Sequence, residues 1–163
     1  MVEIFDVVDE DDNVIGKATR KEVHDKKLIH RSVMFFILDK KGRVFVTQRT
    51  KTKDMFPEYW SVTFGGHVDA GESYDDAVVR EAREEAKIEG KPIFLRSFKK
   101  RIPEEKENSR VYAFVTDKMP KIDKEELKQG KFMTIEEIYD LLKNERFLPE
   151  TKGLLKILRE FQS

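Results

Sequence analysis

The stretch "GGHVDAGESYDDAVVREAREEAK", residues 65–87, decides the fold because it joins a glycine turn to an acidic helix. Ser73 is a suitable N-cap for that helix. Glu81, Glu84 and Glu85 then share one helix face, since they are spaced i, i+3 and i+4. At ~5 Å and an effective dielectric of ~20, each like-charged pair costs roughly 3 kcal/mol. Either water screens this cluster or a cation binds to it.

The composition indicates one globular domain, residues 1–163, that is large enough to bury a core. There are 32 acidic and 32 basic residues, so the zero net charge argues against a nucleic-acid or membrane partner. The absence of cysteine excludes disulfides and a cysteine nucleophile. The acidic N-terminus has no apolar segment that would serve as a signal peptide or membrane span. We expect a cytoplasmic protein with a small-molecule partner, and the sequence leaves a homodimer open.

Strands and helices are predicted to alternate irregularly, which indicates an α/β (α+β) fold with a mixed β-sheet sandwiched between helices. Runs rich in β-branched and aromatic residues predict strands at 3–9, 14–20, 32–39, 44–50, 60–64, 92–102 and 110–117. Capping residues and apolar periodicity predict helices at 20–28, 73–88, 135–145 and 152–161.

Three details of this arrangement can be tested against a structure. The third and fourth strands are expected to pair as a hairpin through the turn "KKGR". The acidic run 103–109 is expected to be a loop between the last two strands. In the central helix, Val79, Ala82 and Ala86 are expected to form the packing stripe, with the glutamates alongside it.

Six positions in residues 66–85 match a known pattern at fixed spacing. Gly66 is followed after five residues by Glu72, and after seven more by the run Arg80–Glu85, "REAREE". At about one chance in ten per position, this match arises about once per million registers. A solvated charged helix is the alternative. The pattern resembles the Nudix box, the signature of the Nudix hydrolase family.

The resemblance implies that Glu81, Glu84 and Glu85 bind Mg²⁺ or Mn²⁺, because the matching glutamates of Nudix enzymes do so. The chemistry agrees with this implication. A diphosphate resists attack by water because its oxygens are already negative, and a hard cation with oxygen ligands neutralises that charge. A helix face that is unfavourable by itself would thus become a cation site.

The resemblance also gives roles to residues around the glutamates. Arg80 would pair with Glu72 and brace the loop on the helix, and the backbone of Gly66 would lie close to the metal. One position departs from the family: the box ends in a glycine where this chain has Lys87. Gly90 would then end the helix one turn later.

Outside the box, "FVTQRTKTKDMFPEYWSVTFGGH", "LIHRSVMFF" and "VDEDDNVIGKATR" resemble type I isopentenyl diphosphate isomerases, which share the Nudix fold. This branch implies that Arg49 and Lys53 contact the substrate diphosphate, although Lys53 could equally be an ordinary surface lysine. Those isomerases transfer protons with a cysteine that precedes a histidine. Gly65 takes that position in "FGGH", so isomerase chemistry is disfavoured.

The three histidines raise a separate hypothesis. His30 and His67 match metal-binding histidines of the isomerases, His24 falls near a third, and Glu107 resembles an accompanying glutamate. The set would suit a second divalent metal such as zinc or manganese. The alternative is that these histidines are packed or hydrogen-bonded structural residues. The acidic run containing Glu104, Glu105 and Glu107 could also supply a general base.

The sequence therefore predicts Mg²⁺- or Mn²⁺-dependent hydrolysis of a diphosphate linkage, in a nucleoside diphosphate derivative or related diphosphate. The catalytic set would be Glu72, Arg80, Glu81, Glu84 and Glu85. Two alternatives remain: an isomerase-like enzyme, and a non-catalytic domain that only senses nucleotides. The intact acidic box argues against the second, since sensor domains usually lose box acids.

Overall fold

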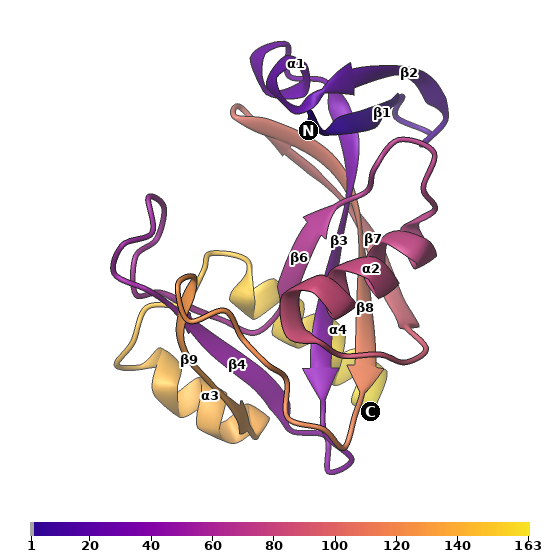
Figure 1. The fold of residues 1–163 in the computed structure, drawn as a ribbon. Helices are drawn as coiled ribbons and strands as arrows, with labels where there is room; N and C mark the ends of the chain where they lie inside the picture. Colours follow the sequence, from indigo (N-terminus) through magenta and orange to yellow (C-terminus); the bar gives the residue numbers. More distant parts are fainter. Residues whose placement is uncertain (1) are drawn as a thin grey trace.

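The computed structural model describes residues 2–163, in which nine strands form one sheet that packs against helices (Figure 1). The elements in chain order are β1 (Ile4–Val8), β2 (Val14–Thr19), α1 (Arg20–Asp25), β3 (Ile29–Leu38), β4 (Val44–Arg49), β5 (Trp60–Ser61), β6 (Phe64–His67), α2 (Tyr74–Ala86), β7 (Ile93–Ile102), β8 (Glu105–Val115), β9 (Leu127–Met133), α3 (Ile135–Leu142) and α4 (Thr151–Gln162). No helix of the described chain is long and apolar enough to span a membrane.

Strand β3 is the centre of the sheet. It pairs in parallel with β8 along its whole length, from Ile29 opposite Lys106 to Leu38 opposite Val115. It also pairs antiparallel with β6 and, at one position, with β1. Strand β7 continues the sheet beyond β8, and β1 and β2 form an N-terminal hairpin. The sheet is mixed, as the sequence predicted.

The predicted β3–β4 hairpin is wrong over most of its length. Only Leu38 and Val44 pair, next to the turn, and β4 then diverges to pair with β9 at six positions. Strand β9 has the sequence "LKQGKFM", whose polar residues and glycine gave no strand signal. The two arms separate because β6 pairs with the edge of β3 that faces β4, and β5 pairs with the corresponding edge of β4.

Helices cover both faces of the sheet (Figure 1). Alternate β3 residues, Val33, Phe35 and Ile37, pack with buried residues of α2. Their neighbours Phe36 and Leu38 pack on the other face with residues of α3 and α4. This alternation follows from the two-residue period of a strand that is buried on both sides. The predicted sheet between helices is confirmed.

Helix α2 begins where the sequence predicted but ends two residues early. The Ser73 side chain accepts a hydrogen bond from the Asp76 backbone N–H at 3.0 Å. The helix ends at Ala86, and Lys87 itself adopts a left-handed conformation with φ 56°. Gly90 therefore does not end the helix. Lys87 takes the conformation that the family's glycine would take, at the strain cost of a side chain there.

The buried stripe of α2 is rotated from the predicted one. Ala77, Val78, Ala82 and Ala86 are fully buried, whereas Val79 is half-buried. The predicted strand 60–64 is likewise divided into β5 and β6. Strand β6 includes Gly65 and Gly66 instead of ending at them. The glycine pair is thus fixed in the sheet beside α2.

The predicted acidic loop 103–109 is mostly strand. Only Pro103 and Glu104 form the turn, and β8 begins at Glu105. Residues at 105 and 107 therefore point to the same side of β8, because side chains alternate along a strand. The parallel register places Glu107 directly opposite His30.

Candidate active site and a neighbouring His/Glu cluster

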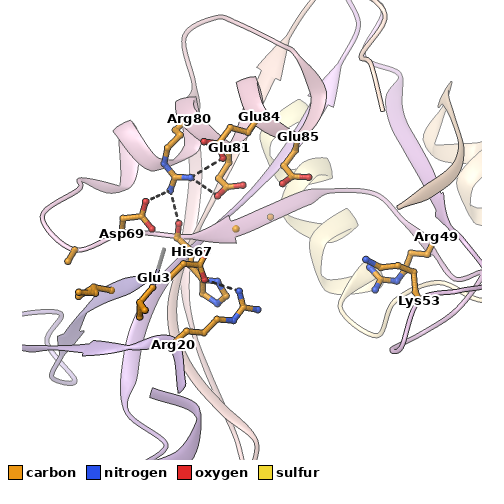
Figure 2. Close-up of a pocket in the computed structure, with 15 residues that line it drawn as sticks. Glu3, Arg20, Arg49, Lys53, His67, Asp69, Arg80, Glu81, Glu84 and Glu85 are labelled. Carbon is orange, nitrogen blue, oxygen red and sulfur yellow. Dashed lines mark hydrogen bonds and ion pairs between the residues drawn. The ribbon is translucent and has the colours of Figure 1, made fainter. Parts of the chain in front are cut away.

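A cavity of about 910 Å³ lies between α2, β6 and the N-terminal hairpin (Figure 2). Its lining includes Gly66, Glu81, Glu84, Glu85 and Arg80, all from the acidic motif. The lining also includes Gly65, His67, Asp69 and Ala70 of the same stretch, and residues from distant parts of the chain: Val2, Glu3, Ile4, Arg20, Arg49 and Lys53. The structure thus joins the motif to two other segments of the sequence.

Glu81 and Gly66 are in close contact. Glu81 is 8% exposed, and a Cβ atom added to Gly66 would lie 2.2 Å from its carboxyl carbon. Any side chain at position 66 would displace this carboxylate. Burial raises the pKa of Glu81 to about 7, and although Arg80 opposes this shift, Glu85 and Glu84 add to it.

Arg80 is the cation that organises the site. Its guanidinium donates to both oxygens of Glu72, at 2.8 and 2.9 Å, and to Glu81 at 2.9 Å. A further donor reaches the backbone oxygen of His67 at 3.0 Å, and Glu84 is 3.3 Å away. Burial would raise the pKa of Glu72, but the Arg80 hydrogen bonds lower it. The predicted Glu72–Arg80 pair is present in the structure.

Glu84 and Glu85 complete the acidic face and are more exposed than Glu81. Burial raises the pKa of Glu85, and the nearby charge of Glu126 raises it further. Arg80 is a single positive charge that donates hydrogen bonds to three carboxylates, those of Glu72, Glu81 and Glu84. Three carboxylates and the adjacent Gly66 backbone are oxygen donors of the kind that Mg²⁺ prefers, and burial raises the pKa of two of them, Glu81 and Glu85. The residues fit a divalent cation.

Arg49 and Lys53 lie across the cavity from the acidic face (Figure 2). Arg49 Nε donates to the backbone oxygen of Met55 at 3.1 Å, and Lys53 pairs with Glu126. Arg20, at the start of α1, lines the opposite wall and pairs with Glu3 at 3.0 Å. Sequence reasoning missed Arg20 in this cavity, because no local pattern brings the N-terminal hairpin to the motif.

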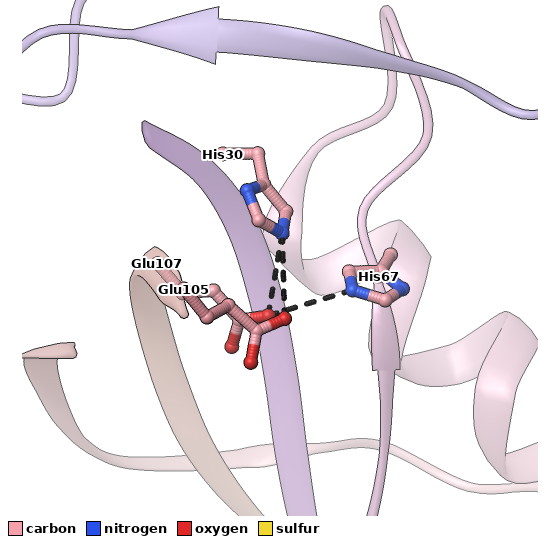
Figure 3. A group of neighbouring side chains, drawn as sticks. All are labelled: His30, His67, Glu105 and Glu107. Atoms are coloured by element: carbon pink, nitrogen blue, oxygen red, sulfur yellow. Dashed lines mark ion pairs between the residues drawn. The ribbon is translucent and has the colours of Figure 1, made fainter. Parts of the chain in front are cut away.

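The histidines converge beside this cavity, together with two glutamates of β8 (Figure 3). Nitrogen and carboxylate atoms of His30, His67, Glu105 and Glu107 all lie within 4.8 Å of one another. Nε2 of His30 is 3.3 Å from Glu107 Oε2, and Nε2 of His67 is 3.4 Å from the same oxygen. Glu105 was considered only as a base in a loop, and the structure adds it to this group.

His24 lies at the edge of the cluster instead of inside it. Its Nε2 is 3.7 Å from Glu105, its ring is 40% exposed, and its Nδ1 bonds to the Arg20 backbone oxygen at 2.9 Å. Glu104 is an exposed turn residue outside the group. The structure thus brings together His30, His67 and Glu107 of the predicted set.

The cluster is internally neutralised. Burial would raise the pKa of Glu107, but the adjacent His30 and His67 hold it well below its usual range. Burial would lower the pKa of His30, but the Glu107 contact raises it. Nδ1 of His30 faces the backbone oxygen of Leu28 at 3.2 Å, which leaves the buried Nε2 facing the cluster without a well-formed hydrogen bond. This orientation is typical of a metal-ligating histidine.

A mixed sheet between helices, with a braced acidic helix face beside a glycine pair, is the arrangement that the resemblance to the Nudix family predicted. Comparison with known proteins agrees: the NUDIX domain model matches residues 28–154. An uncharacterized Nudix hydrolase of Pseudomonas aeruginosa is 31% identical over 160 residues, which are 96% of this chain and 92% of that protein. The chain belongs to the Nudix hydrolase family.

Other relatives match in part. An uncharacterized Nudix hydrolase of Streptomyces coelicolor is 49% identical over 98 residues, which are 59% of this chain and 54% of that protein. The chain thus spans about half the length of this relative. Isopentenyl-diphosphate Delta-isomerase 1 of Photorhabdus laumondii is 31% identical over 146 residues, with 85% and 83% of the two chains covered. The resemblance to the isomerase branch is confirmed.

Solved structures show the same fold. The crystal structure of DR0079 from Deinococcus radiodurans aligns with a TM-score of 0.74 at 27% identity, covering 97% of this chain and 98% of that one. The NUDIX domain of Shewanella oneidensis NrtR, solved with ADP ribose, aligns at 0.63 with 17% identity, covering 90% and 100%. At 17% identity, the likeness to NrtR shows a shared fold and no more.

Proposed function

We propose that this chain is a single Nudix domain that hydrolyses a diphosphate linkage with the help of Mg²⁺ or Mn²⁺. The observation that carries the proposal is the acidic face of α2, where Glu81 is buried against Gly66 with a pKa raised to about 7. Such an arrangement destabilises the protein unless a cation compensates it. Glu84 and Glu85, one turn along, are the exposed ligands of the same face.

When bound, the divalent ion neutralises diphosphate charge and makes water a better nucleophile. The chain's own residues prepare for this chemistry. Arg80 holds Glu81 and Glu84 on one side and Glu72 on the other, so that the loop before α2 stays fixed. Because donors and carboxylates are held before substrate arrives, little reorganisation is needed during the reaction.

The substrate is proposed to be a small diphosphate, such as a nucleoside diphosphate derivative. The cavity of about 910 Å³ has room for a molecule of that size. Arg49 and Lys53 face it from one wall and would bind the phosphates. Arg20, on the opposite wall, would meet the part of the substrate beyond the diphosphate. Arginine and lysine are the residues that bind phosphate oxygens most strongly.

A second divalent ion is proposed at His30, His67, Glu105 and Glu107. Two imidazoles and two carboxylates within 4.8 Å form a donor set that suits zinc or manganese. His24 is near enough to Glu105 to orient it without being a ligand itself. The isomerase reading is disfavoured because Gly65, a residue with no acidic or basic group, lies where the proton-transfer cysteine would be.

The test is a panel of nucleotide and isoprenoid diphosphates, with phosphate products measured with Mg²⁺, with Mn²⁺ and with EDTA. We expect release of phosphate-containing products from at least one nucleoside diphosphate derivative, and none with EDTA. Rearrangement of an isoprenoid diphosphate without hydrolysis would support the isomerase alternative. Binding without turnover across the whole panel would support the sensor alternative.

A further inference from the structure

Lys53 and Glu126 form an ion pair at the rim of the cavity. Lys53 belongs to the loop between β4 and β5, and Glu126 belongs to the segment just before β9. The Lys53 side chain is 25% exposed and lines the cavity, whereas that of Glu126 is 55% exposed and does not line it. The ammonium group that is proposed to bind phosphate is therefore already occupied by a carboxylate.

Arg49, the neighbouring cation, is in a different state. Within residues 2–163, no carboxylate lies within 4.0 Å of its guanidinium, and Nε donates only to a backbone oxygen. Its remaining N–H groups are free to meet an anion. On this wall of the cavity, Arg49 is open to a ligand, whereas the charge of Lys53 is neutralised by Glu126.

Lys53 is the ion partner of Glu126, whose side chain is 55% exposed. A ligand that takes Lys53 would leave the Glu126 carboxylate without that partner, so the carboxylate would turn out toward solvent.

We propose that Glu126 is an affinity-determining residue: an internal anion that a phosphate group must displace from Lys53. The proposal rests on the function proposed above. The exchange weakens the binding of any phosphate that takes Lys53, because the same ion pair must break each time. A diphosphate that also contacts Arg49 can keep part of its affinity without Lys53. Glu126 would thus weaken the binding of a singly phosphorylated product more than that of a diphosphate.

The two loops are joined by more than this ion pair. The backbone N–H of Thr50 donates to the Glu126 backbone oxygen at 3.2 Å. Lys128 also pairs with Glu58 at 3.4 Å, across the same two segments and away from the lining of the cavity. These contacts remain when the Glu126 side chain is neutralised. Glu58→Gln is therefore a matched control, because it removes an ion pair between the same loops without touching Lys53.

The experiment is calorimetric titration of the whole chain with inorganic diphosphate and with orthophosphate, in buffer containing Mg²⁺. Glu126→Gln is expected to bind orthophosphate about fivefold more tightly, on the scale known for exposed ion pairs. It should bind inorganic diphosphate more tightly by a smaller factor. Lys53→Met should bind both anions more weakly than wild type, and Glu58→Gln should bind both as wild type does.

The double variant separates displacement from a general effect of charge. Removing one negative charge near the cavity would favour any anion, with or without Lys53. Displacement predicts instead that Glu126→Gln gains little in a Lys53→Met background, which makes the two changes strongly non-additive. Equal gains in both backgrounds, or weaker binding by Glu126→Gln, would overturn the inference.

Failure of the proposed function would look different. Wild-type protein and Glu58→Gln that bind neither inorganic diphosphate nor orthophosphate would contradict the phosphate site itself, and the inference would fail with it. Wild-type binding that does not respond to Glu126→Gln would contradict only the inference. Thermal denaturation of each variant checks that the fold is intact, since Glu126 is exposed and contributes no core contact.

Discussion

The acidic face of α2 and the His/Glu cluster lie side by side and share β6. They differ in the direction in which the pKa of their most buried glutamate is shifted. On α2, burial raises the pKa of Glu81 to about 7, although the hydrogen bond and charge of Arg80 lower it. In the cluster, His30 and His67 hold the pKa of Glu107 well below its usual range. We therefore expect the first site to depend more on an external cation than the second does. The predictions below test this difference.

The largest effect is expected on the acidic face of α2. Glu84→Gln or Glu85→Gln should lower kcat by at least about 10²-fold, the scale of electrostatic transition-state stabilisation (roughly 3 kcal/mol). Glutamine keeps the size and helix propensity of glutamate but removes a charged ligand. Steady-state kinetics on a substrate found in the panel would measure this. Glu89→Gln, an exposed change just beyond α2, is the control.

Hydrolysis that survives the double change Glu84→Gln and Glu85→Gln would remove the acidic face from the mechanism. Hydrolysis that is indifferent to EDTA would do the same. Either result would show that the acidic face of α2 does not differ from the His/Glu cluster in its need for a metal ion.

A second effect concerns stability against pH in EDTA-treated protein. Glu81 has an unfolded pKa of 4.5 and a folded pKa of about 7, so the native state binds its proton more tightly. The bound proton therefore stabilises the folded state by an amount on the order of 3 kcal/mol. This stabilisation is complete below pH 4.5 and is lost as pH rises through about 7. Glu81→Gln, which stays neutral, should not show this loss.

Urea denaturation at pH 5 and pH 8, with and without Mg²⁺, would measure the effect. At pH 8, Mg²⁺ should restore the free energy of unfolding of the wild type and should change that of Glu81→Gln little. Identical pH dependence of the wild type and Glu81→Gln in EDTA would show that the burial of Glu81 has no energetic consequence.

A third, smaller effect is expected in the cluster. Protein purified without a chelator or affinity tag should carry zinc or manganese, detectable by elemental analysis. Glu107→Gln should lower the affinity for that metal about tenfold or more, since it removes one carboxylate ligand. The same variant should fold, because glutamine keeps the size of glutamate. A folded, metal-free wild type that is active with Mg²⁺ alone would leave the histidines as structural residues.

The smallest effect is expected at the far wall of the cavity. Arg49→Ala and Lys53→Ala should raise KM several-fold and change kcat less, because phosphate binding there is common to ground and transition states. Arg49→Ala should have the larger effect, since no carboxylate within 4.0 Å neutralises it in the described chain. Unchanged kinetics in both variants would exclude this wall from substrate binding.

The sequence predicted the parts of the site that are close in the chain. Glu81, Glu84 and Glu85 lie within five residues, and helix geometry alone places them on one face. Glu72 and Arg80 are eight residues apart and were recognised from the family pattern. The mixed sheet between helices also followed from local patterns of apolar residues.

The parts that were missed depend on distant contacts. Glu105 joins the cluster only because β8 pairs with β3, and Arg20 reaches the cavity only because the N-terminal hairpin lies over β6. Strand β9 was missed because its polar sequence forms a strand only as the partner of β4. A residue pattern carries no signal for such pairing, since the partner supplies the hydrogen bonds.

The parallel pairing of β3 with β8 has a consequence for the order in which the molecule is assembled. His30 and Glu107 are neighbours in the sheet although 77 positions separate them, so their contact closes a long loop. Helix α2 lies within that loop and needs no distant partner for its first turns. Pairing of this kind is slow, because chain entropy is lost before the contacts are gained. The acidic helix face would therefore exist before the cavity around it, and refolding measured with and without Mg²⁺ would show whether the ion acts before or after β3 and β8 meet.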